Sequence, residues 1–160
     1  MDTGLLFVIV VIVLSWLYDF YNGANDSANS IATTVSTRVL TPFKAVLLAA
    51  VLNFAGALVT TEVAKTIGKG LLPEQFMTPL VIISAVVGAL AWAAFATHRG
   101  IPVSITHVMS SAIMGVGSAQ RVSAVRWVIA GNIVIAWILT IPVAGLTATG
   151  VYYLLEAIVG

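Results

Sequence analysis

Charged residues are scarce in this sequence. Lys, Arg, Asp and Glu together make up 8% of the 160 residues, whereas 60% of the chain is apolar. A soluble domain carries about 25% charged residues, so this chain has too few to cover a water-facing surface. Lipid tails require no charge from the protein that faces them. The composition therefore predicts an integral membrane protein.

Cysteine is absent as well, and so are the sequence patterns of nucleotide-binding proteins. Without cysteine there is no disulfide framework. A formal net charge of +1 indicates no nucleic-acid partner. No Walker or dinucleotide-binding glycine pattern occurs, and no nucleophile is paired with an oriented base. We therefore expect neither an enzyme nor a bound cofactor, and no ATP-hydrolysing site within the chain.

Long uncharged runs separate the few charged residues. A membrane-spanning helix needs about 20 apolar residues, and four of the five hydrophobic segments are good candidates. These segments are Gly4–Tyr18, Ala45–Thr61, Gln75–Thr97, Ile101–Gln120 and Trp127–Leu155. No basic region precedes the first, so we expect it to be a retained span and not a signal peptide. The pattern predicts an all-α integral membrane protein with one transmembrane domain, residues 1–160.

A broken or re-entrant helix is predicted at two places in the chain. A single helix from Leu5 to Arg38 would be about 50 Å long, but the hydrocarbon core of a bilayer is only about 30 Å thick. Polar residues between Asp19 and Asn29 interrupt the apolar pattern, so we expect the break within residues 19–38. The second lies within residues 101–120, because Gly100 and Pro102 end the preceding helix.

A polar run lies within the long stretch from Leu5 to Arg38, after its first apolar part. Its polar residues recur at spacings of three or four, which places them on one stripe of a helix: Asn22, Asn25, Asp26, Asn29, Thr33 and Ser36. Unpaired polar groups in hydrocarbon are costly, so such a stripe predicts a functional site. The alternative is a solvent-exposed loop between two spans, since Asn, Asp, Gly and Ser are ordinary loop residues.

A second polar group follows Pro102, at a predicted helix start. Ser104, Thr106 and His107 lie in its first turn, where unpaired backbone N–H groups attract anions. His107 has an alternative role as an interior histidine bonded to a carbonyl. For Ser110, Ser111 and Gly115 we favour helix packing, because small residues allow membrane helices to approach closely; Ser104, Thr106 and His107 are the functional candidates.

The chemistry of the two groups is compatible with a cation and an oxyanion. Carboxamides and hydroxyls can coordinate sodium or donate hydrogen bonds to an oxyanion. Asp26 alone would repel an anion, but it can bind a cation or accept a hydrogen bond from a protonated phosphate. No Lys or Arg lies inside an apolar segment. An anion site would therefore depend on helix ends and a co-bound cation, as in a cation-coupled anion symporter.

Three motifs resemble those of the inorganic phosphate transporter (PiT) family. They are Asp19–Ala32, Ala64–Gly70 and Pro102–His107. The resemblance implies sodium- or proton-coupled phosphate symport across a cell membrane by a multi-pass protein built from inverted repeats. It implies that Asn25, Asp26 and Asn29 bind sodium. It further implies that Asp26, Asn29, Ser104, Thr106 and His107 bind phosphate, although Ile105 replaces a residue that is usually hydroxylated.

The resemblance also bears on assembly, because family members carry the Asn-Asp motif twice and this chain carries it once. Residues 1–100 resemble the start of the first repeat, and residues 101–160 resemble the end of the second. We therefore expect one inverted-repeat unit that pairs as a homodimer. With five crossings the basic residues divide four against three, a balance that allows an antiparallel dimer. The alternatives are a non-transporting truncated or accessory subunit, or transport of sulfate instead of phosphate.

Overall fold

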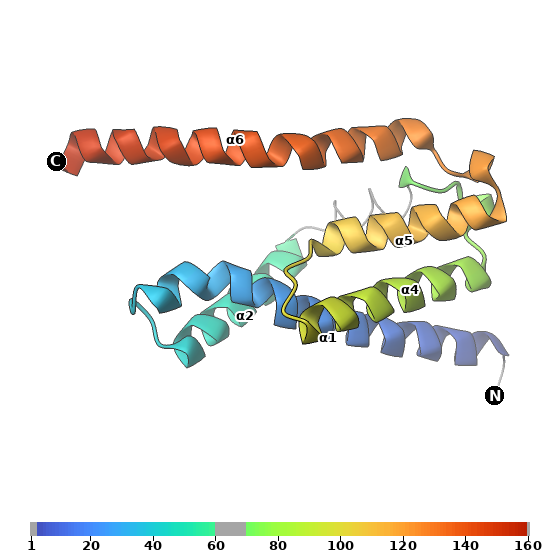
Figure 1. The fold of residues 1–160 in the computed structure, drawn as a ribbon. Coiled ribbons are helices and arrows are strands. Elements are labelled where there is room, and N and C mark those ends of the chain that lie inside the picture. The colour runs from blue at the N-terminus through green and yellow to red at the C-terminus, as the bar shows by residue number, and fades with distance from the viewer. Residues whose placement is uncertain (1–2, 60–69, 160) are drawn as a thin grey trace. The chain divides into compact units, whose positions relative to one another are not determined.

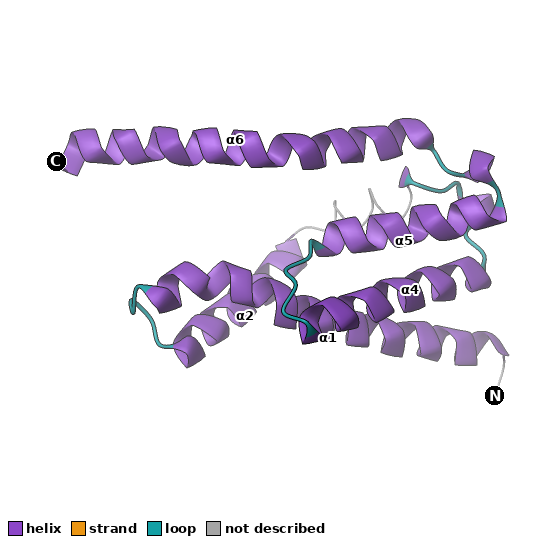
Figure 2. Ribbon diagram, in the orientation of Figure 1, coloured by secondary structure: helices purple, strands orange, loops and turns teal. Residues whose placement is uncertain are grey.

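Every regular element in the described part of the protein is a helix (Figure 2). The structure, a computed structural model, describes residues 3–59 and 70–159. Five α-helices and two short 3₁₀ helices follow one another along those residues: α1 (Thr3–Ser36), α2 (Pro42–Val59), η1 (Glu74–Phe76), α4 (Pro79–His98), α5 (Ile105–Gln120), η2 (Val122–Ala124) and α6 (Trp127–Val159). The predicted all-α membrane fold is confirmed. Most of the Ala64–Gly70 motif lies outside the described residues.

The chain divides into two compact units, which are Met1–Val125 and Arg126–Gly160. In the first unit α1 packs on α4 and α4 packs on α5, and α2 returns along the C-terminal part of α1 (Figure 1). The second unit contains the single helix α6. Both sequence-predicted polar groups belong to the first unit.

Four of the described helices are long and apolar enough to cross a membrane. They are α1, α2, α4 and α6, which agrees with the four good candidates among the five predicted segments. Helix α5 has 16 residues, or about 24 Å, and is shorter than the hydrocarbon core. The sequence predicted a broken or re-entrant helix within residues 101–120, and the structure has one continuous short helix there, α5. Its entry into and return from one side of the membrane stays a prediction.

The break predicted within residues 19–38 is wrong, because α1 is one helix of 34 residues from Thr3 to Ser36. Its polar residues are accommodated without opening the backbone. The Ser27 hydroxyl donates to the Gly23 carbonyl, and the Ser30 hydroxyl donates to the Asp26 carbonyl at 3.0 Å. The hydroxyl groups of these two serines are therefore hydrogen-bonded within their own helix. A helix of about 51 Å exceeds the hydrocarbon thickness and requires tilting or protruding ends.

Two helices of the first unit end in the same kind of turn. After α4, Gly100 has a φ of 65°, its N–H donates to the Thr97 carbonyl, and the N–H of Ile101 donates to the Ala96 carbonyl at 2.9 Å. This pattern of bonds is a Schellman motif, in which a left-handed residue ends a helix and satisfies its last carbonyls. Arg38 occupies the left-handed position after α1, with a φ of 60°.

A stripe of alanines on α4 makes the core of the first unit. Ala85, Ala89, Ala93 and Ala96 recur at helical spacing, and all four are buried. Tyr18 of α1 and Val108 of α5 pack against Ala89 and Ala93. Small side chains let neighbouring membrane helices approach closely, which increases dispersion contacts where no hydrophobic effect operates. The stripe is therefore what holds α1 and α5 on α4.

Gly117 of α5 lies where the end of this helix meets two buried side chains. A Cβ atom on Gly117 would lie 2.6 Å from Leu72 Cδ2 and 3.2 Å from Val125 Cγ2. We expect Gly117→Ala to lower the free energy of unfolding by about 1 kcal/mol, because the overpacking cost exceeds the gain in helix propensity. Thermal unfolding in detergent, followed by circular dichroism, measures the change.

The matched control for this variant is Gly115→Ala in the same helix. A Cβ atom on Gly115 meets no atom within 4 Å, so only the favourable propensity of alanine acts there. We expect the melting temperature to stay the same or rise. Equal shifts in both variants would show that Leu72 moves aside without cost.

Candidate functional site

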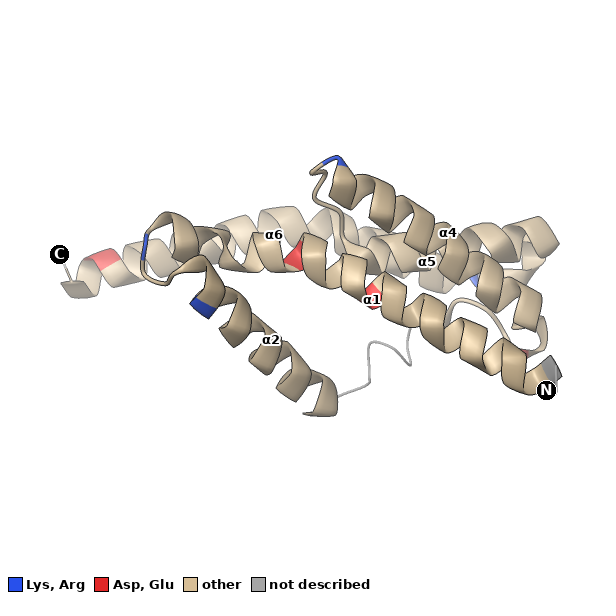
Figure 3. Cartoon of the chain, turned by 90° about the horizontal axis from the view of Figure 1, so that it is seen from below, with Lys and Arg blue, Asp and Glu red and all other residues tan. Residues whose placement is uncertain are grey.

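The acidic end of the candidate site lies along α1, facing α2. Asp19 and Asp26 are the acidic positions on this otherwise uncharged helix (Figure 3). A hollow of about 970 Å³ lies between the middle of α1 and α2. Asp26 and Asn29 line it together with Asn22, so three of the predicted polar stripe's residues share one cavity.

Asn53 of α2 lines the same hollow from the opposite side. Its side-chain amide donates to the Ala49 carbonyl at 2.9 Å, one turn back in its own helix. This residue is not among those that the sequence patterns predicted for the site. The available signal was a lone carboxamide in the apolar segment Ala45–Thr61, which is costly in a membrane unless it has a partner or a role.

Asn25 does not join this group, although the sequence placed it in the same sodium set as Asp26 and Asn29. Its side chain is buried, with 8% of its surface exposed, and it contacts the segment between α4 and α5. The side-chain amide donates to the Ile101 carbonyl at 3.0 Å and to Thr97 Oγ1 at 3.3 Å. Its Oδ1 accepts from the Val103 N–H at 3.1 Å. The predicted sodium ligands are therefore divided between two sides of α1.

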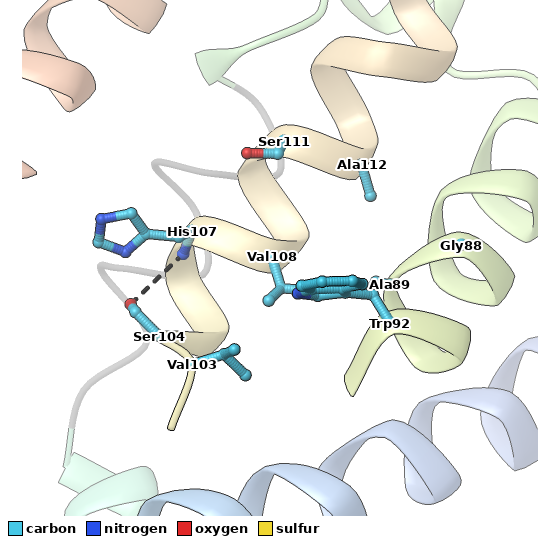
Figure 4. Close-up of a pocket in the computed structure, with 9 residues that line it drawn as sticks. All are labelled: Gly88, Ala89, Trp92, Val103, Ser104, His107, Val108, Ser111 and Ala112. Carbon is cyan, nitrogen blue, oxygen red and sulfur yellow. Dashed lines mark hydrogen bonds between the residues drawn. The ribbon is translucent and has the colours of Figure 1, made fainter. Parts of the chain in front are cut away.

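The hydroxyl end of the candidate site is the first turn of α5. Ser104 is the N-cap of this helix, and its Oγ accepts a hydrogen bond from the His107 N–H at 3.5 Å (Figure 4). Serine is a favoured N-cap because its hydroxyl satisfies one of the otherwise unbonded first N–H groups. The helix start predicted after Pro102 is confirmed. The remaining N–H groups of this turn give it a partial positive charge.

Ser104 and His107 border a second hollow, of about 670 Å³, between α4 and α5. Its walls are mostly apolar and include Trp92, Ala89 and Val108. In Figure 4 the His107 ring lies on the side of α5 away from Trp92. Thr106 is exposed and does not line this hollow. The structure therefore brings Ser104 and His107 together and leaves Thr106 on another side of the same turn.

The packing residues predicted on α5 have different surroundings. Ser110 is fully buried, whereas Ser111 and Gly115 are exposed. Ser111 lines the hollow between α4 and α5. The predicted packing role therefore fits the burial of Ser110, whereas the close contact of α5 is at Gly117, against Leu72 and Val125, which lie outside the helices.

The two ends of the candidate site offer different chemistry. Asp26, Asn29 and Asn53 present carboxylate and carboxamide oxygens, which are suited to a hard monovalent cation. The first turn of α5 presents a hydroxyl and backbone N–H groups, which are suited to an oxyanion. Within residues 3–59 and 70–159, no group of three or more His, Asp or Glu side chains could hold a metal ion. A cation here would rely on carboxamide and backbone oxygens beside the carboxylate of Asp26, with the carboxylate of Asp19 in the same hollow.

A family comparison covers both ends of this site. The sequence model of the phosphate transporter family matches residues 22–107 and 93–148. The chain belongs to the phosphate transporter family. The first matched stretch begins at Asn22 and ends at His107, so it contains the polar run of α1 and the first turn of α5. The resemblance seen in the sequence motifs is confirmed.

Individual relatives of this chain have names that agree with the family. A "Probable low-affinity inorganic phosphate transporter" of Streptomyces halstedii is 43% identical over 125 residues, which are 77% of this chain and 58% of the relative. A protein of the same name from Bacillus subtilis (strain 168) is 41% identical over 121 residues, which are 74% of this chain and 36% of the relative. These relatives are transporters and not enzymes, as the sequence predicted.

A solved structure named "The sodium-dependent phosphate transporter" is similar in fold. It has a TM-score of 0.89 and 32% sequence identity, over 94% of this chain and 39% of that chain. This chain thus spans between 36% and 58% of the length of the three relatives described. Family membership and four apolar helices together make it a multi-pass membrane protein. The assignment of residues 1–100 and 101–160 to different repeats stays a prediction.

Proposed function

We propose that this phosphate transporter family chain takes part in cation-coupled symport of inorganic phosphate. The observation that carries the proposal is the bonding of Asn25, in the polar run of α1, to the segment that leads into α5. This contact keeps α1, which carries the oxygens suited to a cation, next to the first turn of α5, which is suited to an anion. The names of the relatives support phosphate as the anion.

In this proposal Asp26 and Asn29 bind the coupling ion. Sodium is favoured over a proton by the name of the similar solved structure and by the carboxamides of Asn29 and Asn53, which can coordinate a metal ion but do not titrate. Ser104, Thr106 and His107, with the N–H groups of the first turn of α5, bind phosphate. A cation next to Asp26 offsets its repulsion of the anion, and this dependence couples the two movements.

We also propose that two copies of the chain assemble in the cell membrane. Asn29 is exposed and Asp26 is only partly covered, although both lie within a membrane-spanning helix. A carboxylate that faces lipid is costly, so this face requires a protein cover. A second, antiparallel copy would provide that cover and a second Asn-Asp run. The mass of the purified complex in detergent tests the assembly, and an active monomer would contradict it.

Uptake by the purified chain in liposomes tests the transport proposal. With an inward sodium gradient, we expect radiolabelled phosphate to accumulate, and we expect sodium-free vesicles with a proton gradient to accumulate much less. Excess unlabelled phosphate should compete, whereas sulfate should compete little, because sulfate near neutral pH has no proton with which to donate a hydrogen bond. No uptake by a well-folded dimer would favour the accessory-subunit alternative. Competition by sulfate would favour the other substrate.

A further inference from the structure

We propose that Asn25 is a positioning residue that fixes the first turn of α5 on α1, and that it is not a ligand of the coupling ion. The inference rests on the proposed function for what is positioned, namely the phosphate-binding end of α5. Asn25 and Asp26 are neighbours in the sequence, but the proposal gives them different roles. Asp26 lies on the side of α1 that carries the proposed ion site, and Asn25 lies on the side that contacts the segment leading into α5.

The segment between α4 and α5 needs external hydrogen-bond partners. It runs from Arg99 to Ser104 without regular structure, and Pro102 has no N–H. The Schellman turn satisfies the N–H groups of Gly100 and Ile101. Irregular backbone at membrane depth persists only where protein groups or water satisfy it. The Ile101 carbonyl and the Val103 N–H both find their partner in the one carboxamide of Asn25.

Both polar atoms of the Asn25 side chain are therefore engaged. The nitrogen donates at 3.0 Å to Ile101 and at 3.3 Å to Thr97, and the oxygen accepts at 3.1 Å from Val103. For Asn25 to coordinate sodium, its oxygen would have to share with or release the Val103 N–H. Val103 is half-buried and its N–H lies against the buried Asn25 side chain, where an unsatisfied N–H is costly, so the structure favours the bond to Val103 over a bond to an ion.

Tyr18 provides a second tether on the same side of α1. Its hydroxyl donates to the Ile105 carbonyl at 3.0 Å, and its ring is buried against Ala89, Ala93 and Val108. Tyr18 precedes Asn25 by seven residues, or two helical turns, so the two side chains share one face. Together they attach α1 to the residues on both sides of Ser104.

The consequence is a short mechanical link between the two halves of the proposed site. Asp26 is the next residue after Asn25, and successive residues on a helix point in different directions. A movement of α1 that accompanies ion binding at Asp26 is carried by Asn25 to the first turn of α5. Loss of the link should weaken phosphate binding while ion binding remains.

Asn25→Asp distinguishes positioning from ion binding, because it keeps the acceptor of Val103 and removes both donors to Ile101 and Thr97. A positioning role predicts that the KM for phosphate rises about tenfold, as expected for the loss of one or two hydrogen bonds, while the half-saturating sodium concentration changes less than about twofold. A ligand role predicts the opposite, since a carboxylate is a stronger cation ligand: altered sodium dependence with an unchanged phosphate KM would overturn the proposal.

Hydrogen exchange at the Val103 amide gives a readout that does not require transport. We expect fast exchange in Asn25→Ala, which removes the acceptor, and near-native protection in Asn25→Asp, which keeps it. The control is Asn132→Ala, which removes an exposed carboxamide from α6 and should leave Val103 protection unchanged. Slow exchange at Val103 in a folded Asn25→Ala variant would overturn the positioning role. If the wild-type chain transports nothing, the proposed function fails while this test still applies.

Discussion

Asp26→Asn is expected to reduce sodium-driven phosphate uptake about a hundredfold or more. Asp26 lines the hollow between α1 and α2, whose other polar side chains are carboxamides, serine hydroxyls and the carboxylate of Asp19. Removing one partner of a close charge pair costs about 2–5 kcal/mol, and each 1.4 kcal/mol is a factor of ten. The variant is nearly isosteric, so α1 should keep its helical structure. Initial uptake rates in liposomes at saturating phosphate measure the effect.

Glu156→Gln is the control for the loss of a carboxylate. Glu156 is exposed near the end of α6 and has no role in the proposed site. Its uptake should stay within about twofold of the wild-type rate, as is usual for surface positions. If Asp26→Asn keeps more than about a tenth of the wild-type rate, the coupling ion does not depend on this carboxylate.

Ala93→Leu is expected to have the largest effect on folding. Ala93 is fully buried in the alanine stripe of α4, where Tyr18 and Val108 pack against it. Three additional carbon atoms there would push α1 and α5 away from α4. Overpacking of this kind costs about 1–3 kcal/mol and at times more. We expect a melting temperature in detergent several degrees lower, with the Asn25 and Tyr18 tethers weakened as the helices separate.

Ala91→Leu tests whether burial, and not leucine itself, causes the loss. Ala91 lies two residues earlier on the exposed face of α4, and leucine has a helix propensity close to that of alanine. Its melting temperature should be unchanged. Equal melting temperatures for the two variants would mean that α4 does not pack closely on α1 and α5.

Several local features of the fold were readable in the sequence. The helix that starts after Ser104 follows from an N-cap serine two residues after Pro102. The end of α4 follows from Gly100, which adopts the left-handed conformation that other residues avoid. These features are local because they depend on the preferences of a few consecutive residues. The four apolar spans were likewise predictable, since length and hydropathy alone define them.

The sequence predicted a break in α1, and the structure shows a continuous helix. The run from Asn22 to Ser30 is unfavourable for an isolated helix because its side chains compete for backbone hydrogen bonds. In the folded chain Ser27 and Ser30 bond within the helix, and Asn25 bonds to another segment. For Asn25 the competition is removed by partners that lie more than 70 residues away in the sequence. Composition could not show those partners.

The sequence by itself determined that this is a helical membrane protein with a polar run on one segment and a hydroxyl-rich helix start on another. Helical periodicity placed Asn25, Asp26 and Asn29 on one broad stripe. Only the tertiary structure decided that Asn25 contacts the α4–α5 segment, whereas Asp26 and Asn29 face Asn53 of α2. The physical reason is that periodicity describes angles around one helix axis. The neighbours on each side of that axis are chosen by packing between helices that are distant in sequence.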